Sequence, residues 1–143
     1  MVGAGELGEG RRTETKGGSA TMRILVCDDD EKSHSLADAI FKDTGVTVEH
    51  ALDAVSAEAA VRKGGYSLVL MDIDMPSFSG IKAVNWIRSM SGQGSQVPII
   101  ALTSHTAAEY EQKCLAAGMN GFIEKPLRRA SLTQVINKIL NVR

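Results

Sequence analysis

The residue best placed for chemistry in this chain is Asp72, which directly follows the apolar run Leu68–Met71. An unbroken apolar run, bounded by Gly64-Gly65 and by Pro76, is typical of a strand buried on both faces of a parallel sheet. Ligand sites in such sheets lie beyond the carboxyl ends of the strands, which is where this carboxylate is delivered. Taken alone, Asp72 fits equally well as a carboxylate that caps the next turn.

Polar residues follow three other apolar segments in the same way. Residues 24–27 run into Asp28, Asp29 and Asp30, residues 97–102 into Thr103 and Ser104, and residues 121–123 into Glu124 and Lys125. The carboxyl ends of parallel strands meet at one edge of a sheet, so these acids, hydroxyls and amine are expected to share one rim. The chemistry expected there is that of a carboxylate assisted by neighbouring acids, a hydroxyl and a cation.

Alternating strand and helix patterns explain how these groups come together. We expect strands at 23–27, 46–50, 67–71, 97–102 and 121–123, with helices between them. The helical stripes comprise Leu36, Ala37, Ile40 and Phe41; Val55, Ala59 and Val61; Ile81, Val84 and Ile87; Leu132, Val135, Ile136 and Ile139; a further helix is expected between Thr106 and Gly118. This order predicts an α/β fold, a doubly wound five-stranded parallel sheet of the flavodoxin-like (βα)5 type, in a single domain.

Composition narrows the function classes. Lys plus Arg (16) nearly balances Asp plus Glu (17) among 143 residues, so charge favours neither a nucleic-acid nor an anionic-membrane partner. With no apolar run of about 20 residues and no secretory signal, we expect a cytoplasmic location. Residues 1–21 hold six of the 14 glycines and are expected to form a flexible tail or linker, with the fold beginning near residue 22.

The motifs, in order and spacing, resemble the receiver domain of two-component response regulators, over essentially all of residues 22–143. Residues 111–119 resemble in particular the receivers of hybrid sensor kinases or phosphorelays. The matching positions are the acidic pair Asp28-Asp29, the phosphoacceptor Asp72, the switch residues Thr103 and Phe122, and Lys125 followed by a cis proline, Pro126.

This resemblance implies Mg²⁺-dependent transfer of a phosphoryl group from a phosphohistidine to Asp72. Two like charges ~4 Å apart repel by about 4 kcal/mol at an effective dielectric near 20, and a divalent cation relieves that repulsion. Mg²⁺ prefers oxygen ligands, which here are Asp29 and Asp72 directly, Asp28 through water, and the backbone carbonyl at Asp74. Such a domain catalyses its own phosphorylation and dephosphorylation and is not a turnover enzyme.

Phosphorylation is then expected to switch the face made by the fourth helix, fifth strand and fifth helix, through Thr103, Phe122 and Lys125. Three residues depart from the family pattern and are expected to border the phosphoryl group and tune its lifetime: Asp74, Ser104 and His105. We expect Asp30 to open the first helix, because an acid in the first turn complements the helix dipole.

Partners follow from the same resemblance. A sensor histidine kinase or a histidine phosphotransfer protein is expected to dock on the helix bearing Leu36 and on the loop at Pro126. The downstream protein is not identified, and the chain is expected to be a monomer or weak dimer without direct nucleic-acid or membrane contact. His34 is expected to be a solvated helix residue, His50 a strand-end residue, and Trp86 partly buried.

Two other functions fit parts of the pattern. The motif Asp72-Ile-Asp74 after a buried strand also opens the haloacid dehalogenase-like phosphatases, which use an aspartate nucleophile. Their motif lies on the first strand, however, whereas here an acidic pair precedes it. The second alternative is a receiver-like scaffold that works unphosphorylated, although every expected site residue is present.

Overall fold

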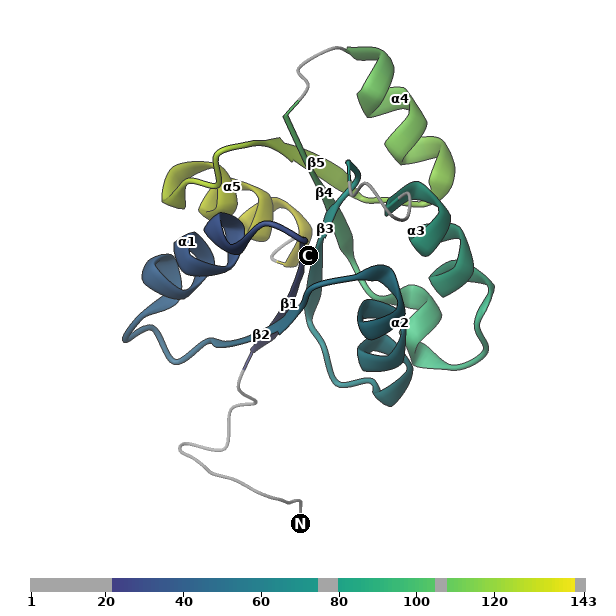
Figure 1. Ribbon diagram of the computed structural model, residues 1–143, viewed down its shortest axis with the longest axis horizontal. Coiled ribbons are helices and arrows are strands. Elements are labelled where there is room, and N and C mark those ends of the chain that lie inside the picture. The colour runs from purple at the N-terminus through teal and green to yellow at the C-terminus, as the bar shows by residue number, and fades with distance from the viewer. Residues whose placement is uncertain (1–21, 75–79, 105–107, 141–143) are drawn as a thin grey trace.

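The computed structural model describes residues 22–74, 80–104 and 108–140, which form one α/β domain (Figure 1). Its five strands are all parallel and lie in the order β2-β1-β3-β4-β5. The strands are β1 (Arg23–Cys27), β2 (Thr47–Ala51), β3 (Leu68–Asp72), β4 (Ile99–Thr103) and β5 (Gly121–Glu124). The predicted flavodoxin-like sheet is therefore confirmed, with strand ends within two residues of the expected ones.

Helices cover both faces of the sheet (Figure 1). One face carries α1 (Glu31–Phe41) and α5 (Arg129–Leu140), and the other carries α2 (Ala54–Lys63), α3 (Gly80–Ser89) and α4 (Ala108–Ala117). A short 3₁₀ helix, η1 (Gln93–Gln96), precedes β4. The structure therefore has the two outer helical layers that a parallel sheet needs to bury both faces.

The central strand β3 explains why its sequence is uniformly apolar. Leu68 and Leu70 pack into the cluster beneath α1 and α5, whereas Val69 and Met71 pack into the cluster beneath α2, α3 and α4. All four side chains are fully buried. Because successive strand residues point to opposite faces, a strand covered on both sides has no polar face.

The apolar stripe predicted for α2 is partly wrong. Val55 is 69% exposed and Ala59 is also exposed, while Ala54, Ala57, Glu58 and Val61 face the sheet. The buried face of α2 includes a charged residue, Glu58. Its carboxylate is paired with the Arg62 guanidinium at 2.7 Å, which offsets the cost of burying it. A pattern that counts only apolar residues therefore places the buried face incorrectly.

Strand register aligns the polar residues that follow the strands. Cys27 lies opposite Met71, Asp72 opposite Leu102, and Thr103 opposite Glu124. The carboxyl ends of β1, β3, β4 and β5 therefore finish at one edge of the sheet, as the sequence predicted.

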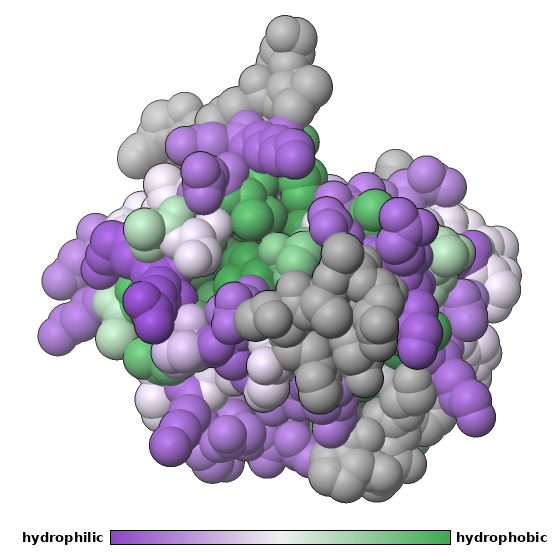
Figure 2. Space-filling view, turned by 90° about the horizontal axis from the view of Figure 1, so that it is seen from above, coloured by the Kyte–Doolittle hydropathy of each residue, from purple (hydrophilic) through white to green (hydrophobic). Residues whose placement is uncertain are grey.

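The coloured part of the face seen in Figure 2 is mostly hydrophilic, with an apolar area near the centre of the view. Trp86 is 45% exposed and is among the exposed large hydrophobic side chains, so it is less buried than expected. None of the helices in the described ranges is long and apolar enough to cross a membrane.

Candidate functional site

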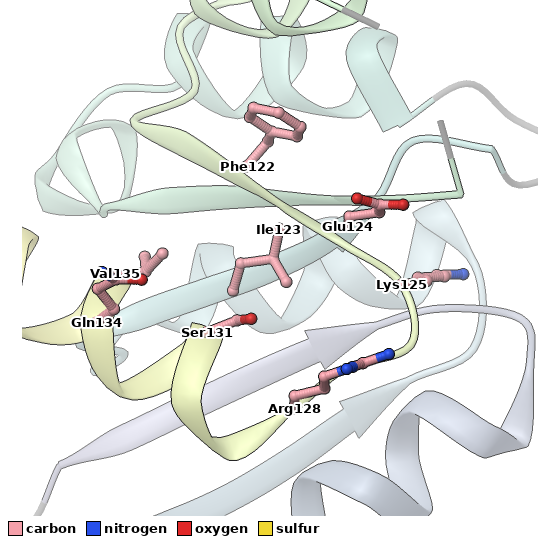
Figure 3. A pocket seen from close by; sticks show the side chains of 8 residues that line it. All are labelled: Phe122, Ile123, Glu124, Lys125, Arg128, Ser131, Gln134 and Val135. Carbon is pink, nitrogen blue, oxygen red and sulfur yellow. The ribbon is translucent and has the colours of Figure 1, made fainter. Parts of the chain in front are cut away.

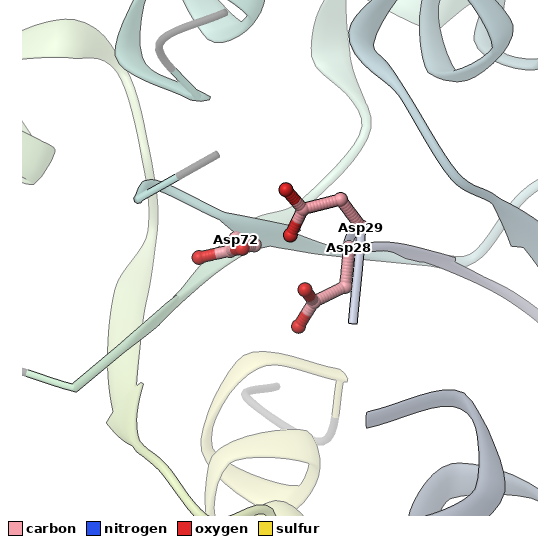
Figure 4. A group of neighbouring side chains, drawn as sticks. All are labelled: Asp28, Asp29 and Asp72. Atoms are coloured by element: carbon pink, nitrogen blue, oxygen red, sulfur yellow. The ribbon is translucent and has the colours of Figure 1, made fainter. Parts of the chain in front are cut away.

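Three carboxylates gather at the ends of β1 and β3 (Figure 4). Asp28 and Asp29 follow β1, Asp72 is the last residue of β3, and an oxygen from each lies within 4.8 Å of the others. Asp28 and Asp72 are buried, whereas Asp29 is exposed. The structure therefore brings together the three acids that the sequence predicted, with one of them facing solvent.

Lys125 supplies the cation of this cluster. Its Nζ lies 2.9 Å from Oδ2 of Asp28 and 3.5 Å from Oδ1 of Asp72. Burial alone would lower the pKa of Lys125, but the two carboxylates outweigh that effect and raise its pKa. The lysine is therefore a fixed positive charge beside two buried acids.

The two buried carboxyl groups respond differently to burial. For Asp28, burial favours the neutral acid, but hydrogen bonds from Ser33 and Lys125 outweigh it and hold the pKa of Asp28 below its ordinary value. For Asp72, burial and the neighbouring Asp28 raise the pKa from 3.8 to about 6. Two acids that share a site cannot both ionise easily. Asp28 therefore ionises at a lower pH than Asp72.

Asp28 is held by several hydrogen bonds besides that of Lys125. Its Oδ1 accepts from the backbone N–H of Asp30 at 2.9 Å, and its Oδ2 accepts from the Ser33 hydroxyl at 2.5 Å. Asp30 caps α1 by accepting from the backbone N–H of Lys32, which confirms its expected role at the helix start. Ser33 was not singled out from the sequence, because a helical serine five residues beyond an acid has no distinctive spacing.

The Thr103 hydroxyl lies on the other side of Asp72. Thr103 is fully buried, and its Oγ1 lies 3.4 Å from Oδ2 of Asp74. The backbone N–H of Ser104 is also 3.4 Å from that oxygen, while the backbone N–H of Asp74 donates to Oδ1 of Asp72 at 2.9 Å. Asp74 therefore contacts both Asp72 and Thr103, and Ser104 contacts Asp74, whereas His105 lies outside the described residues.

The expected solvated state of His34 is wrong. His34 is 5% exposed and contacts the backbone carbonyl of Asp28 through Nε2 at 2.8 Å. Its Nδ1 lies 2.6 Å from Nδ1 of His50, on β2. Helical periodicity counted from apolar residues alone could not place this histidine on the buried face of α1.

Gly80 is a second residue that the sequence interpretation missed. An added Cβ at Gly80 would lie 2.3 Å from the backbone oxygen of Asp72 and 2.7 Å from Cα of Ile73. No side chain can fit at that distance, so α3 can approach the end of β3 only through glycine. The close approach is visible only in three dimensions.

Phe122 and Pro126 flank Lys125 on β5 and the loop after it. Phe122 is partly buried against the core cluster on the α4 side, while Ile123 belongs to the cluster on the α5 side; Figure 3 shows the two on opposite faces of β5. The peptide bond between Lys125 and Pro126 is cis, as the resemblance implied. A cavity of about 460 Å³ lies between β5 and α5, lined by Phe122, Ile123, Glu124, Lys125, Arg128, Ser131, Gln134 and Val135.

Comparison with known proteins agrees with the fold and the acid cluster described above. Residues 24–137 match the response regulator receiver domain family. Over 130 residues the chain is 35% identical to hybrid signal transduction histidine kinase B of Dictyostelium discoideum, a match covering 83% of this chain but 7% of that protein. The chain therefore spans only a small part of the length of this curated relative.

Solved structures agree on the fold. The receiver domain of sensor histidine kinase PA1611 from Pseudomonas aeruginosa PAO1 has 30% identity and a TM-score of 0.75, over 85% of this chain and 99% of that one. That structure has a magnesium ion coordinated in its active site cleft. The chemotaxis protein CheY4 of Vibrio cholerae has 27% identity and a TM-score of 0.76, over 84% of this chain and 99% of that one. These findings favour neither a phosphatase nor an unphosphorylated scaffold.

Proposed function

Since this chain belongs to the response regulator receiver domain family of two-component systems, we propose that Asp72 accepts a phosphoryl group from a phosphohistidine. The observation that carries the proposal is the position of the Asp72 carboxylate. It ends a central strand, is 2% exposed, and lies beside Lys125 and the two other acids. A buried carboxylate in this setting is suited to act as a nucleophile, although its Oδ1 also accepts from the backbone N–H of Asp74.

The proposed transfer makes one bond and breaks one. An oxygen of Asp72 attacks the phosphorus atom of the phosphohistidine, forming an acyl phosphate. The P–N bond breaks, its electron pair returns to the donor imidazole, and that ring takes a proton from solvent. Because the attacking carboxylate must be ionised, its pKa of about 6 leaves it mostly competent at neutral pH even before a cation binds.

The site fits Mg²⁺. Its donors are all carboxylate oxygens, they lie within 4.8 Å of one another, and three acidic charges face one lysine. We assign direct ligation to Asp29 and Asp72, an indirect role through water to Asp28, and a further ligand to the backbone carbonyl of Asp74. When bound, Mg²⁺ would neutralise charge on the phosphoryl oxygens.

Lys125 has a related role. Its ammonium group is already held at the edge of the acid cluster by Asp28, so it can turn to a phosphoryl oxygen on Asp72 with little movement. A compact point charge suits this task, because the charge on the transferring group is spread over several oxygens. The domain thus promotes its own phosphorylation and dephosphorylation without being a turnover enzyme.

We expect the phosphoryl group to draw the Thr103 hydroxyl away from Asp74. Phosphorylation adds about 1.5 to 2 negative charges and three acceptor oxygens, and one charge-assisted hydrogen bond contributes about 1.5 to 3 kcal/mol. Moving an equilibrium from 1:99 to 99:1 takes about 5.5 kcal/mol, so Lys125 and repacking around Phe122 must supply the rest. The face of α4, β5 and α5 is therefore the proposed output surface.

The proposed partners follow from these surfaces. A sensor histidine kinase or a histidine phosphotransfer protein would dock on α1, where Leu36 is 36% exposed, and on the loop at Pro126. An unidentified downstream protein would read the output surface, with residues 22–143 acting as the functional unit and residues 1–21 as a tail or linker. We propose a cytoplasmic monomer or weak dimer.

Chemical trapping tests the proposed phosphoacceptor. The chain is incubated with acetyl phosphate and Mg²⁺, and then treated with borohydride, which reduces an aspartyl phosphate to homoserine. Tandem mass spectrometry should find homoserine at position 72. Homoserine at another acid would contradict the assignment, and continuous release of phosphate from a small monoester would favour a phosphatase. Absence of any adduct would favour an unphosphorylated scaffold.

A further inference from the structure

Two histidines form a chain of contacts that ends at the acid cluster. Nε2 of His34 lies 2.8 Å from the backbone oxygen of Asp28, the Nδ1 atoms of His34 and His50 lie 2.6 Å apart, and Nε2 of His50 lies 3.0 Å from Oδ1 of Asp38. The two rings meet edge to face, with centroids 4.7 Å apart. We call these three side chains the histidine chain.

Counting protons shows how the histidine chain must be arranged. A carbonyl oxygen and a carboxylate only accept hydrogen bonds, so both Nε2 atoms carry hydrogen. One further proton must lie between the two Nδ1 atoms. The three contacts of the two rings therefore call for three ring hydrogens in all.

The contact between the rings is a hydrogen bond rather than a metal site. Two imidazole nitrogens that bind one zinc ion at about 2.0 to 2.1 Å in tetrahedral geometry lie roughly 3.4 Å from each other. The observed distance of 2.6 Å is too short for that arrangement. His34 is 5% exposed and both of its ring nitrogens have contacts, so it is also not available as a phosphate carrier.

The histidine chain acts on the peptide that joins Asp28 to Asp29. The backbone N–H of Asp28 donates to the carbonyl of Ala51 at 3.1 Å, and the Asp28 carbonyl accepts from His34. Because both the N–H and the carbonyl group of Asp28 are hydrogen-bonded, the orientation of the peptide plane between Asp28 and Asp29 is fixed. The exposed Asp29 carboxylate is thereby aimed beside Asp28 and Asp72.

We propose that His34, itself oriented by His50 and Asp38, is a positioning residue for the Asp28–Asp29 peptide and thereby sets the affinity of the acid cluster for Mg²⁺. His34 touches neither the cation nor the phosphoryl group. This inference deepens the proposed function and rests on its assignment of Asp29 as a ligand. Residues that orient metal ligands commonly change metal affinity about 10- to 100-fold when replaced.

Paired substitutions of His34 separate its hydrogen bond from its packing. His34→Leu fills a similar space without a donor, whereas His34→Gln can present an amide N–H where Nε2 now lies. We expect His34→Leu to weaken Mg²⁺ binding about tenfold, measured by isothermal titration calorimetry, and His34→Gln to restore most of that loss. Equal weakening in both variants, or none in either, would overturn the proposal.

A control on the same helix guards against a merely structural effect. Ile40 is a buried α1 residue in the apolar cluster beneath α1 and α5. Ile40→Ala should lower the melting temperature yet leave Mg²⁺ affinity within about twofold of the parent. If Ile40→Ala weakens Mg²⁺ binding as much as His34→Leu, the effect is general loosening of α1 and the proposal fails.

Nitrogen spectroscopy tests the histidine chain directly. In the ¹⁵N-labelled protein we expect a coupling between the two Nδ1 atoms across their hydrogen bond, and three N–H signals from the rings of His34 and His50. Asp38→Asn replaces the carboxylate that His50 contacts and should weaken the coupling. Two ring N–H signals without a coupling would contradict the proton count.

Phosphorylation gives an independent readout. At saturating Mg²⁺, His34→Leu should be labelled on Asp72 by acetyl phosphate to the level of the parent. If the parent itself is never labelled, the proposed function fails while the effect of His34 on Mg²⁺ affinity can still be measured. Incomplete labelling of His34→Leu at saturation would show that His34 does more than position a ligand, and would overturn the inference.

Discussion

The two sides of the site are built differently. On the side of β1, which we call the Asp28 side, the Asp28 carboxylate accepts hydrogen bonds from Ser33 at 2.5 Å, Asp30 at 2.9 Å and Lys125 at 2.9 Å. On the side of β4, which we call the Thr103 side, the Thr103 hydroxyl lies 3.4 Å from Asp74. Hydrogen bonds weaken as they lengthen, so this contact between Thr103 and Asp74 is weaker than each of the three made by Asp28.

This difference matches the tasks that we propose for the two sides. The Asp28 side must hold like charges together before a cation or a donor arrives, and short charge-assisted hydrogen bonds do that. The Thr103 side must change partners after phosphorylation, and a contact of 3.4 Å is easily given up. Short bonds thus mark the fixed part of the site, and long ones mark the part that we expect to move.

Removing the lysine should have the largest effect, because it breaks the Asp28 side. Lys125→Met leaves two buried carboxylates without their cation, and breaking a buried ion pair in this way costs about 3 to 5 kcal/mol. Urea unfolding at neutral pH without Mg²⁺ should show this loss. Added Mg²⁺ should recover part of the stability, since it binds the same acids. A loss below about 1 kcal/mol would contradict the role given to this ion pair.

The close approach of α3 to β3 supports both sides, and breaking it should also destabilise the fold. Gly80→Ala places a Cβ 2.3 Å from the backbone oxygen of Asp72, and overpacking of this kind costs about 1 to 3 kcal/mol. Labelling by acetyl phosphate should also fall, because the end of β3 must move. Gly121→Ala is the matched control, since its Cβ would meet only the end of the Ile100 side chain, at 3.3 Å.

Neutralising the nucleophile should stabilise the fold. The pKa of Asp72 is raised from 3.8 to about 6, so the folded state binds the proton more tightly than the unfolded state. The stability associated with that proton is present below about pH 4 and is lost as pH rises through about 6. At about 1.4 kcal/mol per pKa unit, Asp72→Asn should gain about 2 to 3 kcal/mol at pH 7 without Mg²⁺.

The control for this prediction is the same comparison at acid pH. At about pH 4, where Asp72 is protonated in the folded state, Asp72→Asn and the parent should have nearly equal free energies of unfolding. A gain that does not depend on pH would mean that the asparagine stabilises the fold through packing and not through loss of charge.

The smallest effects should come from removing the hydroxyl groups of Ser33 and Thr103. The ratio of the two losses in stability tests whether the Asp28 side is held more firmly than the Thr103 side. Ser33→Ala removes the 2.5 Å hydrogen bond to Asp28 and should cost about 1 to 3 kcal/mol, because a buried charged acceptor loses a partner. Thr103→Val keeps the shape of the side chain and should cost less than about 1 kcal/mol. Equal costs in thermal unfolding would show that the two sides are held alike.

Much of the site could be predicted from the sequence, because it depends on features with a fixed spatial meaning. Strands in a parallel sheet end at the same edge, so Asp28, Asp72 and Lys125 could be placed together before their contacts were known. Ser33 and His34 could not, because their partners depend on which face of α1 turns inward. Gly80 could not be predicted for a similar reason, since its role depends on the distance between the backbones of α3 and β3.

The measurement that tests the account most directly is the intact mass of the chain after incubation with acetyl phosphate. It is made with Mg²⁺ and with chelator, on the parent and on Asp72→Asn. The account predicts the gain of one phosphoryl group in the parent, dependent on Mg²⁺, and no gain in Asp72→Asn. A phosphoryl group that persists in Asp72→Asn, or one that forms equally well with chelator, would contradict the assignment of Asp72 as a Mg²⁺-dependent phosphoacceptor.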